Sequence, residues 1–304
     1  MLKNNKHLLF ILIVIILMII TGCTNEDQTN QSDEKNQADE QSFKITMEFQ
    51  ELIEHNAKPA QLYEFINEQL EDVPKEVITN LLLALEDQLT AQIKDFSQVL
   101  EDDEVQLKLE ELSKENNFEI NEIQEEALKE QLAEIVENGY KMELLKGTYK
   151  VKIDYSQMEI YKTDVTEEMS EYITIQAKES SQLYEKDLML TISWEELSDR
   201  LAHTEKFLSS YPESVRANII ERIYLNYLIP YLQGLPNTPA YDVESKQFNQ
   251  ELIDSYTQWI ESYPDSRTTL IIREHLQNLK EANYLYTNEI AKSLDKLLEQ
   301  SLTQ

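Results

Sequence analysis

The chain has very little glycine and proline, with 4 Gly and 7 Pro among 304 residues. Both residue types end helices and form tight turns, so their scarcity argues against many short strands and favours long helices. Hydrophobic residues make up 41% of the chain, enough to bury the core of one large or two medium domains. The composition therefore predicts a folded, mainly α protein.

Positive charge is also scarce. Lys and Arg total 27 against 58 Asp and Glu, which gives a formal net charge of −31. Such a chain repels phosphate polymers, so nucleic acid and anionic lipid head groups are poor partners, whereas a cationic partner or divalent metal ions would be attracted. A simpler interpretation is that the acids form solvated helix faces that give solubility.

Cysteine occurs once, at Cys23, so the chain cannot form an internal disulfide and must be stable through packing alone. A basic start and an apolar run from Leu8 to Ile20 precede this cysteine. As a helix, that run reaches only about 20 Å, short of the ~30 Å hydrocarbon core that a permanent span must cross. Residues 1–22 are therefore predicted to be a cleaved export signal.

The sequence "ITGC" at residues 20–23 resembles the lipobox of bacterial lipoproteins, in which a Leu-like residue and two small residues precede an invariant cysteine. The resemblance implies cleavage between Gly22 and Cys23 and attachment of a diacylglycerol to the Cys23 thiol. The protein would then be lipid-anchored at the cell membrane on its extracytoplasmic face, because two acyl chains suffice for stable anchoring. Ile20 stands where Leu is commonest, and an ordinary secretory signal with an incidental cysteine is the alternative.

The rest of the chain divides by composition and by hydrophobic period. Residues 23–42 are predicted to be the lipidated cysteine and a disordered acidic tether, because Ala38 is the only apolar residue from 24 to 42. Apolar residues at spacings of three and four predict an N-terminal helical region over 43–138. Residues 139–190 are expected to hold a β-hairpin and helices.

The hairpin is placed near residues 140–155, where Tyr149, Val151 and Ile153 alternate with polar residues after Gly147. A helical-repeat region is expected over 191–304. It begins at "ISWEEL", residues 192–197, where the serine and the glutamate three residues later have the spacing of a capping box.

The C-terminal region contains a duplication. "FLSSYPESVRANII" at 207–220 matches "WIESYPDSRTTLII" at 259–272, at an offset of 52 residues. Each copy predicts a helix, a tight turn and a second helix. The turn residues are Tyr211, Pro212 and Ser214 in the first copy and Tyr263, Pro264 and Ser266 in the second. Ser214 and Ser266 are each expected to cap the helix that follows.

This turn between amphipathic helices resembles that of tetratricopeptide-type lipoproteins, including outer-membrane assembly factors. The resemblance covers about residues 193–285 and implies stacked, tetratricopeptide-like helical hairpins, although the period is 52 residues and not about 34. The segment from Gly139 into the first copy is also similar to uncharacterised bacterial exported proteins, which implies no activity.

The chain shows no catalytic or metal-binding motif. His7, His55, His203 and His275 are isolated from one another and from Cys23, so no zinc site of a usual kind is expected. Three glycines after the signal do not make a phosphate-binding loop, and "EDDE" at 101–104 lacks the alternating ligands of a calcium loop. No catalytic residue, metal or cofactor is therefore predicted, apart from the covalent lipid.

A stretch with concentrated proline and tyrosine, "IPYLQGLPNTPAYD" at 229–242, separates the two copies. Exposed tyrosines there could contact a partner, because they add contact area at low entropy cost. The candidate partner-binding residues are Tyr224, Tyr227, Tyr231 and Tyr241. The alternative is a stiff connector whose tyrosines lie in the helical core.

These features predict an extracytoplasmic lipoprotein that acts as a non-catalytic scaffold or adaptor for a protein or peptide. The alternative is a cell-envelope enzyme or ligand-sensing protein, with a site between the central hairpin and its flanking helices. A deep pocket with converging acids of perturbed pKa would favour the enzyme, and a shallow groove lined by Tyr and Leu would favour the adaptor.

Overall fold

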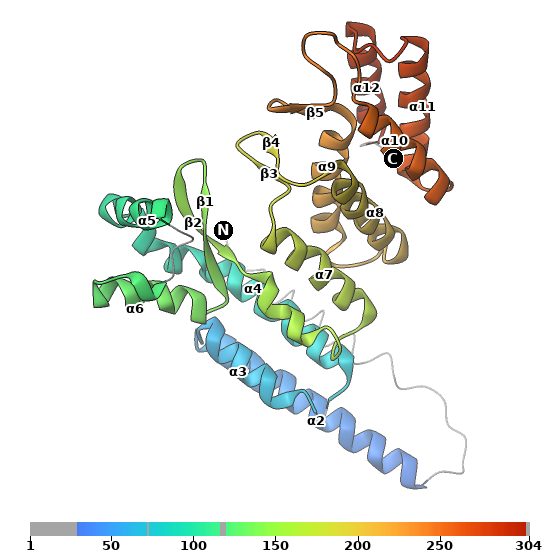
Figure 1. Cartoon of the computed structure of the whole chain (residues 1–304). Helices are drawn as coiled ribbons and strands as arrows, with labels where there is room; N and C mark the ends of the chain where they lie inside the picture. The colour runs from blue at the N-terminus through green and yellow to red at the C-terminus, as the bar shows by residue number, and fades with distance from the viewer. Residues whose placement is uncertain (1–28, 72, 116–119, 302–304) are drawn as a thin grey trace, which may run out of the picture. The chain divides into compact units, whose positions relative to one another are not determined.

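The structure, a computed structural model, describes residues 29–71, 73–115 and 120–301 (Figure 1). By internal contacts the chain divides into two units, residues 1–45 and 46–304. The predicted signal, the lipobox at 20–23 and Cys23 lie outside the described residues. No helix in the described part of the chain has the length and apolar character needed to cross a membrane.

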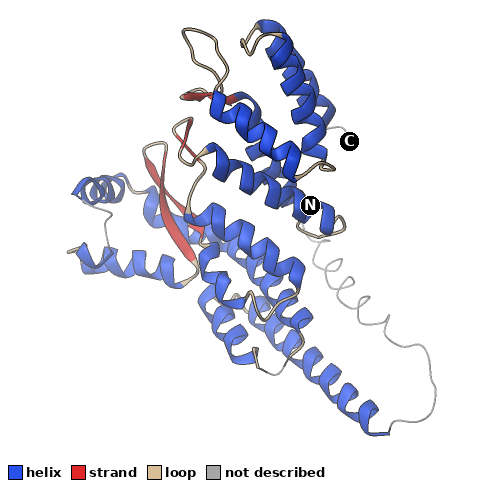
Figure 2. Cartoon of the chain, turned by 45° about the vertical axis from the view of Figure 1, so that its right-hand side comes forward, coloured by secondary structure: helices blue, strands red, loops and turns tan. Residues whose placement is uncertain are grey.

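The fold is mainly α, as the composition predicted, and the strands of the described residues form small two-stranded antiparallel sheets (Figure 2). The helices described before the central hairpin are α2 (Thr29–Glu54), α3 (Pro59–Gln69), α4 (Lys75–Ser97), α5 (Asp103–Glu115) and α6 (Glu126–Glu137). Those after it are α7 (Glu167–Ser181), α8 (Trp194–Ser210), α9 (Ala217–Gln233), α10 (Gln250–Ser262), α11 (Arg267–Glu281) and α12 (Asn288–Ser301). The described residues also contain three 3₁₀ segments: η2 (Gln98–Glu101), η3 (Ile120–Glu122) and η4 (Tyr155–Tyr161).

The structure differs from the predicted tether. Residues 29–42 belong to α2 and are helical, and only 24–28 of the predicted disordered segment lie outside the described residues. Glu, Gln, Lys and Ala, which are good helix formers, make up 7 of the 14 residues from 29 to 42, and no glycine or proline interrupts this segment. A lack of apolar residues removes a core-facing stripe, but it does not remove helix propensity.

Helix α4 forms the centre of the N-terminal helical region and packs against α3 and the hairpin. One face of α4 is fully buried, as its spacing of three and four predicted. The buried residues of this face include Ile78, Leu81, Leu82, Leu85 and Leu89. Tyr140 closes the contact with the hairpin, since its hydroxyl donates to the Leu89 carbonyl oxygen at 2.8 Å.

The predicted hairpin is confirmed as β1 (Tyr140–Leu145) paired antiparallel with β2 (Thr148–Ile153). Its turn residues Lys146 and Gly147 both have positive φ, 51° and 78°, which is the geometry that matches the twist of a two-residue hairpin. Two further hairpins were not predicted: β3 (Glu185–Lys186) with β4 (Met189–Leu190), and β5 (Gly234–Leu235) with β6 (Thr238–Pro239). Strands of two residues are too short to show an alternating pattern.

A buried ion pair ties α4 to the start of the repeat region. The Glu86 carboxylate of α4 lies 2.8 Å from Nε of Arg216, which immediately precedes α9. Tyr155 donates its hydroxyl to the same carboxylate at 2.6 Å, and Arg216 also reaches Asp87 at 2.8 Å. The repeats are therefore joined to the helices before them by charge as well as by packing.

Candidate functional site

The duplicated sequence forms two helical hairpins, α8 with α9 and α10 with α11, and α8 also packs on α10 (Figure 1). The two turns begin in the same way. Tyr211 has φ −131° and ψ 59°, and Tyr263 has φ −130° and ψ 58°. Each tyrosine N–H donates to the carbonyl four residues before it, Phe207 at 2.9 Å and Trp259 at 2.8 Å. The predicted helix, turn and helix are confirmed in both copies.

The turns differ in how the next helix is capped. Ser266 caps α11 as predicted, because its hydroxyl accepts from the Thr269 N–H at 3.0 Å. Ser214 does not cap α9, and that prediction was wrong. Its hydroxyl accepts from the Arg216 N–H at 3.1 Å, and a further turn delays the start of α9 to Ala217. The delay follows from local backbone bonding within 214–217, where the Ala217 N–H donates to the Ser214 carbonyl at 3.0 Å.

Three of the candidate partner-binding tyrosines lie in the core. Tyr224, Tyr227 and Tyr231 are buried on one face of α9, and their hydroxyls join neighbouring helices. Tyr224 bonds the Thr268 hydroxyl at 2.7 Å, Tyr231 bonds the Ser255 hydroxyl at 2.6 Å, and Tyr227 donates to the Glu179 carboxylate. The expectation that these three tyrosines contact a partner is corrected. Residues spaced three and four apart share one face of a helix, and this face of α9 packs against the neighbouring helices.

Tyr241 is the exception among the four. It is half-buried and stacks on Tyr286, with ring centroids 4.1 Å apart and an interplanar angle of 11°. The Lys246 ammonium lies 5.3 Å from its ring centroid. A partner role for Tyr241 stays a prediction.

A groove opens between the two copies. A cavity of about 830 Å³ lies between α8 and the end of α10 with the turn into α11; we call it the repeat groove. Helix α8 contributes side chains from Asp199 to Ser209, and Trp259 and the turn from Tyr263 to Arg267 form the opposite side. The predicted turn residues Tyr263, Pro264 and Ser266 therefore line a cavity. Their counterpart Tyr211 lines a separate hollow between α7 and α8.

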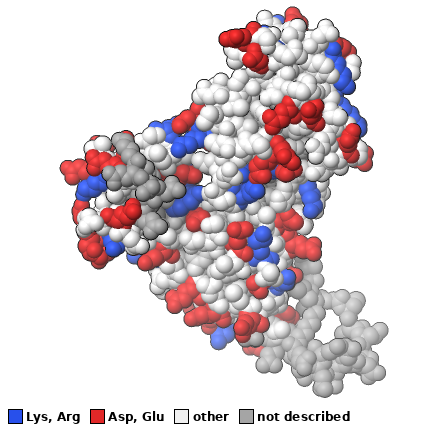
Figure 3. All heavy atoms as spheres, viewed as in Figure 1, with Lys and Arg blue, Asp and Glu red and all other residues white. Residues whose placement is uncertain are grey.

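Acidic and basic side chains both line the repeat groove, but most of the bases have partners within the chain. The Arg267 guanidinium pairs with Glu221 at 3.0 Å and lies 3.9 Å over the Tyr224 ring. His203 pairs with Glu171 of α7. Lys206 is exposed. On the face shown in Figure 3, Asp and Glu are spread over the surface with Lys and Arg among them.

The acids of the repeat groove are Asp199, Glu205 and Asp265. Asp265 is exposed. Partial burial raises the pKa of Asp199, and the neighbouring carboxylates of Glu195 and Glu196 raise it further. Glu205 is the buried member of the set, with 8% of its surface exposed. Glu205 could not be distinguished in the sequence, because it is one acid among 58 and its contact with Thr268 joins α8 to the second copy.

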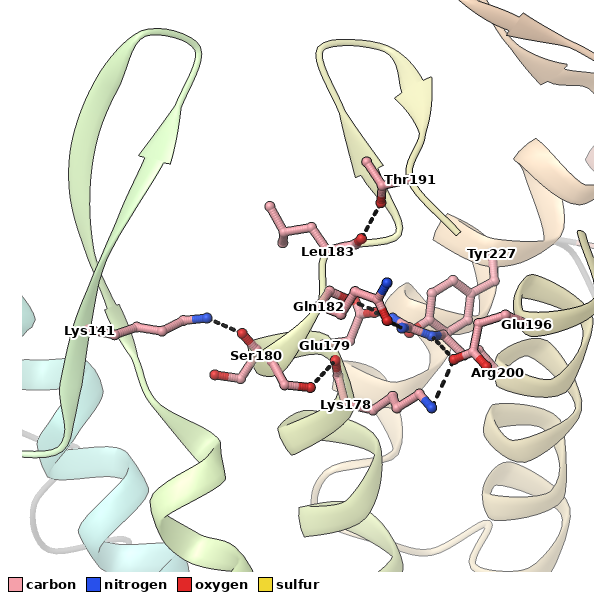
Figure 4. Close-up of polar contacts among 11 residues, drawn as sticks. Lys141, Lys178, Glu179, Ser180, Gln182, Leu183, Thr191, Glu196, Arg200 and Tyr227 are labelled. Atoms are coloured by element: carbon pink, nitrogen blue, oxygen red, sulfur yellow. Dashed lines mark hydrogen bonds and ion pairs between the residues drawn. The ribbon is translucent and has the colours of Figure 1, made fainter. Parts of the chain in front are cut away.

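A second polar cluster lies where α7, α8 and α9 meet (Figure 4). The Arg200 side chain, 3% exposed, donates to Glu196 at 2.9 Å, to Glu179 at 3.1 Å and to the Gln182 carbonyl at 2.8 Å. Tyr227 donates to the Glu179 carboxylate as well. Burial raises the pKa of Glu179, while the Tyr227 hydroxyl and the Arg200 guanidinium oppose that shift.

We call this cluster the Arg200 cluster. It lies next to the region expected for an alternative enzymatic site, because Lys141 of the central hairpin donates to the carbonyl of Ser180, the residue after Glu179 (Figure 4). Arg200 and Tyr227 both donate to Glu179, so the contacts support a structural joint between three helices. Within the described residues no group of three His, Cys, Asp or Glu side chains could hold a metal ion.

Comparison of the chain with known protein families, with curated proteins and with solved structures finds no match in any of the three.

Proposed function

We propose that the protein is an extracytoplasmic lipoprotein, anchored to the membrane through Cys23, that acts as a non-catalytic scaffold and binds an extended protein segment or peptide in the repeat groove. The observation that carries the proposal is the cavity of about 830 Å³ between the two copies of the duplicated hairpin. Stacked helical hairpins generally present such concave surfaces to partners, an argument by analogy of fold. The volume also falls in the range of about 300–1,000 Å³ typical of binding sites.

Filling the repeat groove should weaken peptide binding. Ala202 of α8 is half-buried and lines the groove, so Ala202→Trp places an indole where the partner would lie. We expect peptides selected from a displayed random library against the full-length protein to bind at least tenfold more weakly to this variant, as measured by isothermal titration calorimetry.

Val215→Trp is the matched control, because Val215 is 70% exposed on the first turn and does not line the groove. It should leave the affinity of the same peptides unchanged. The proposed function would be contradicted if the library yielded no binding peptide, or if the selected peptides bound Ala202→Trp as tightly as wild type.

The anchor is tested separately. Cys23→Ala removes the thiol that would carry the diacylglycerol, and each buried CH₂ of an acyl chain contributes about 0.8 kcal/mol to membrane binding. We expect wild-type protein, expressed in a bacterium that processes lipoproteins, to incorporate radioactive palmitate and to sediment with membranes. The variant should lose the label. Thr24→Ala, one residue further on, should retain it; equal labelling of Cys23→Ala and wild type would refute the anchor.

A further inference from the structure

The wall of the repeat groove contains a buried carboxylate with few partners. One oxygen of Glu205 accepts from the Thr268 backbone N–H at 3.4 Å, which is a long hydrogen bond. Its other oxygen has no hydrogen-bond partner within the described part of the chain. Removing an ionised carboxylate from water costs several kcal/mol unless a cation or several donors compensate. Glu205 therefore lacks the compensation that buried acids normally have.

The bases of the groove do not supply this compensation by direct contact. Arg267 is held by Glu221 and the Tyr224 ring, and His203 is held by Glu171. Burial lowers the pKa of Arg267 and its hydrogen bond to Glu221 raises it, whereas Glu205 adds only a smaller attraction without a direct contact. Lys206 also lines the groove, but it is exposed and forms no ion pair with Glu205 among the described residues. Glu205 thus lacks a direct counter-ion, and Asp199 and Asp265 add negative potential around it.

The remaining lining suits the rest of a peptide. Tyr263 exposes 42% of its surface beside Pro264, and Trp259 lies beneath them as a buried floor. An aromatic ring close to an acid can stabilise a cationic side chain through both its face and its apolar area. A phosphate or other anion would be repelled by the three carboxylates here, and Arg267 and His203, which could attract it, are already paired with Glu221 and Glu171.

We infer that the repeat groove binds a basic side chain, Lys or Arg, of an extended peptide segment, whose charged group pairs with Glu205 and whose backbone lies along Tyr263 and Pro264. This inference rests on the proposed function and specifies the partner's chemistry. The charge of the chain supports the same occupant, because a net charge of −31 attracts a basic segment and repels an acidic one.

Calorimetry with two synthetic peptides tests the inference on the full-length protein in nonionic detergent. One peptide, about ten residues long and blocked at both ends, contains two lysines among Gly, Ser, Pro and Tyr; the other has norleucine in place of both lysines. We expect the lysine peptide to bind wild type at least tenfold more tightly than the norleucine peptide. Glu205→Gln should remove that advantage while keeping the shape of the side chain.

Glu213→Gln is the matched control, because Glu213 occupies in the first copy the position that Asp265 has in the second, and it does not line the groove. It makes the same change in net charge and should alter the affinity by less than twofold. Asp265→Asn removes a second acid of the groove at an exposed position, where the substitution does not disturb the core. It should weaken binding of the lysine peptide about threefold. Far-ultraviolet circular dichroism checks that every variant is folded.

Several outcomes would overturn the inference. If Glu205→Gln and Glu213→Gln weakened binding of the lysine peptide equally, the peptide would be attracted by the net negative charge of the protein and not by a specific site. Equal binding of both peptides, each blocked by Ala202→Trp, would keep the proposed function and reject the cation site, whereas failure of both peptides to bind wild type would count against both. Spermine binding with the same dependence on Glu205 and the same affinity as the lysine peptide would identify a small-amine site and reject the peptide.

Discussion

Arg200→Met should lower the free energy of unfolding by about 3–5 kcal/mol, the usual cost of removing one partner from a buried ion pair. The Arg200 guanidinium bonds two carboxylates and one backbone carbonyl, and methionine replaces its stem but none of its donors. Glu196 keeps Lys178 at 2.9 Å, so the loss falls mainly on Glu179. Urea denaturation at pH 7, followed by circular dichroism, measures the change.

Lys178→Met is the matched control for Arg200→Met. It removes a cation from the same cluster, but the Lys178 side chain is half-exposed, and exposed ion pairs contribute about 0–1 kcal/mol. We expect its effect to stay within that range. A loss from Arg200→Met no larger than the loss from Lys178→Met would show that the Arg200 cluster does not hold the three helices together.

The pH dependence of the Arg200→Met variant should identify Glu179 as the group left unpaired. Burial already raises the pKa of Glu179 in the folded protein, and loss of the guanidinium removes one of the groups that oppose this rise. A carboxyl whose folded pKa lies above its unfolded value gains stability as pH falls, because the folded state then binds more protons. The loss of unfolding free energy in Arg200→Met, relative to wild type, should therefore become smaller as the pH falls from 7 to 5. Adding Glu179→Gln should recover part of it at pH 7.

Local sequence signals predicted much of this fold. The buried stripe of α4, the hairpin turn at Lys146 and Gly147, and the two turns at Tyr211 and Tyr263 are each encoded within a few neighbouring residues. Ser193 likewise caps α8 by accepting from the Glu196 N–H at 3.1 Å, as their spacing predicted. Such features depend on periodicity and capping, which sequence shows directly.

Contacts between distant elements could not be predicted in the same way. Tyr227 became a partner-binding candidate because its type suits interfaces, yet its hydroxyl reaches Glu179, 48 residues earlier in the chain. Glu205 is 8% exposed, and it contacts the second copy through the Thr268 N–H, 63 residues later in the chain. The sequence therefore predicted the turn residues that line the repeat groove but missed the acid in its wall.

His275 should make the protein less stable in acid. It is fully buried in α11, with ring centroids of Phe248 and Tyr256 at 5.7 and 5.9 Å. Burial lowers the pKa of His275 to about 4 from the ordinary 6.5, and the backbone of Leu232 opposes part of this shift. Between these two pH values the unfolded chain binds the proton and the folded chain does not, so stability is complete above pH 6.5 and falls towards pH 4. At 1.36 kcal/mol for each pH unit, the contribution is about 3 kcal/mol.

The comparison of wild type with His275→Leu isolates this contribution, because the acidic groups of the chain titrate in both proteins. We expect the unfolding free energy of wild type, from urea denaturation at constant ionic strength, to fall by about 3 kcal/mol more than that of the variant between pH 7 and pH 4. His55→Gln, at an exposed position before α3, should follow wild type throughout. Parallel pH curves for wild type and His275→Leu would mean that the imidazole is protonated as easily in the folded chain as in the unfolded one. Burial among Phe248 and Tyr256 would then not disfavour the charged form of His275.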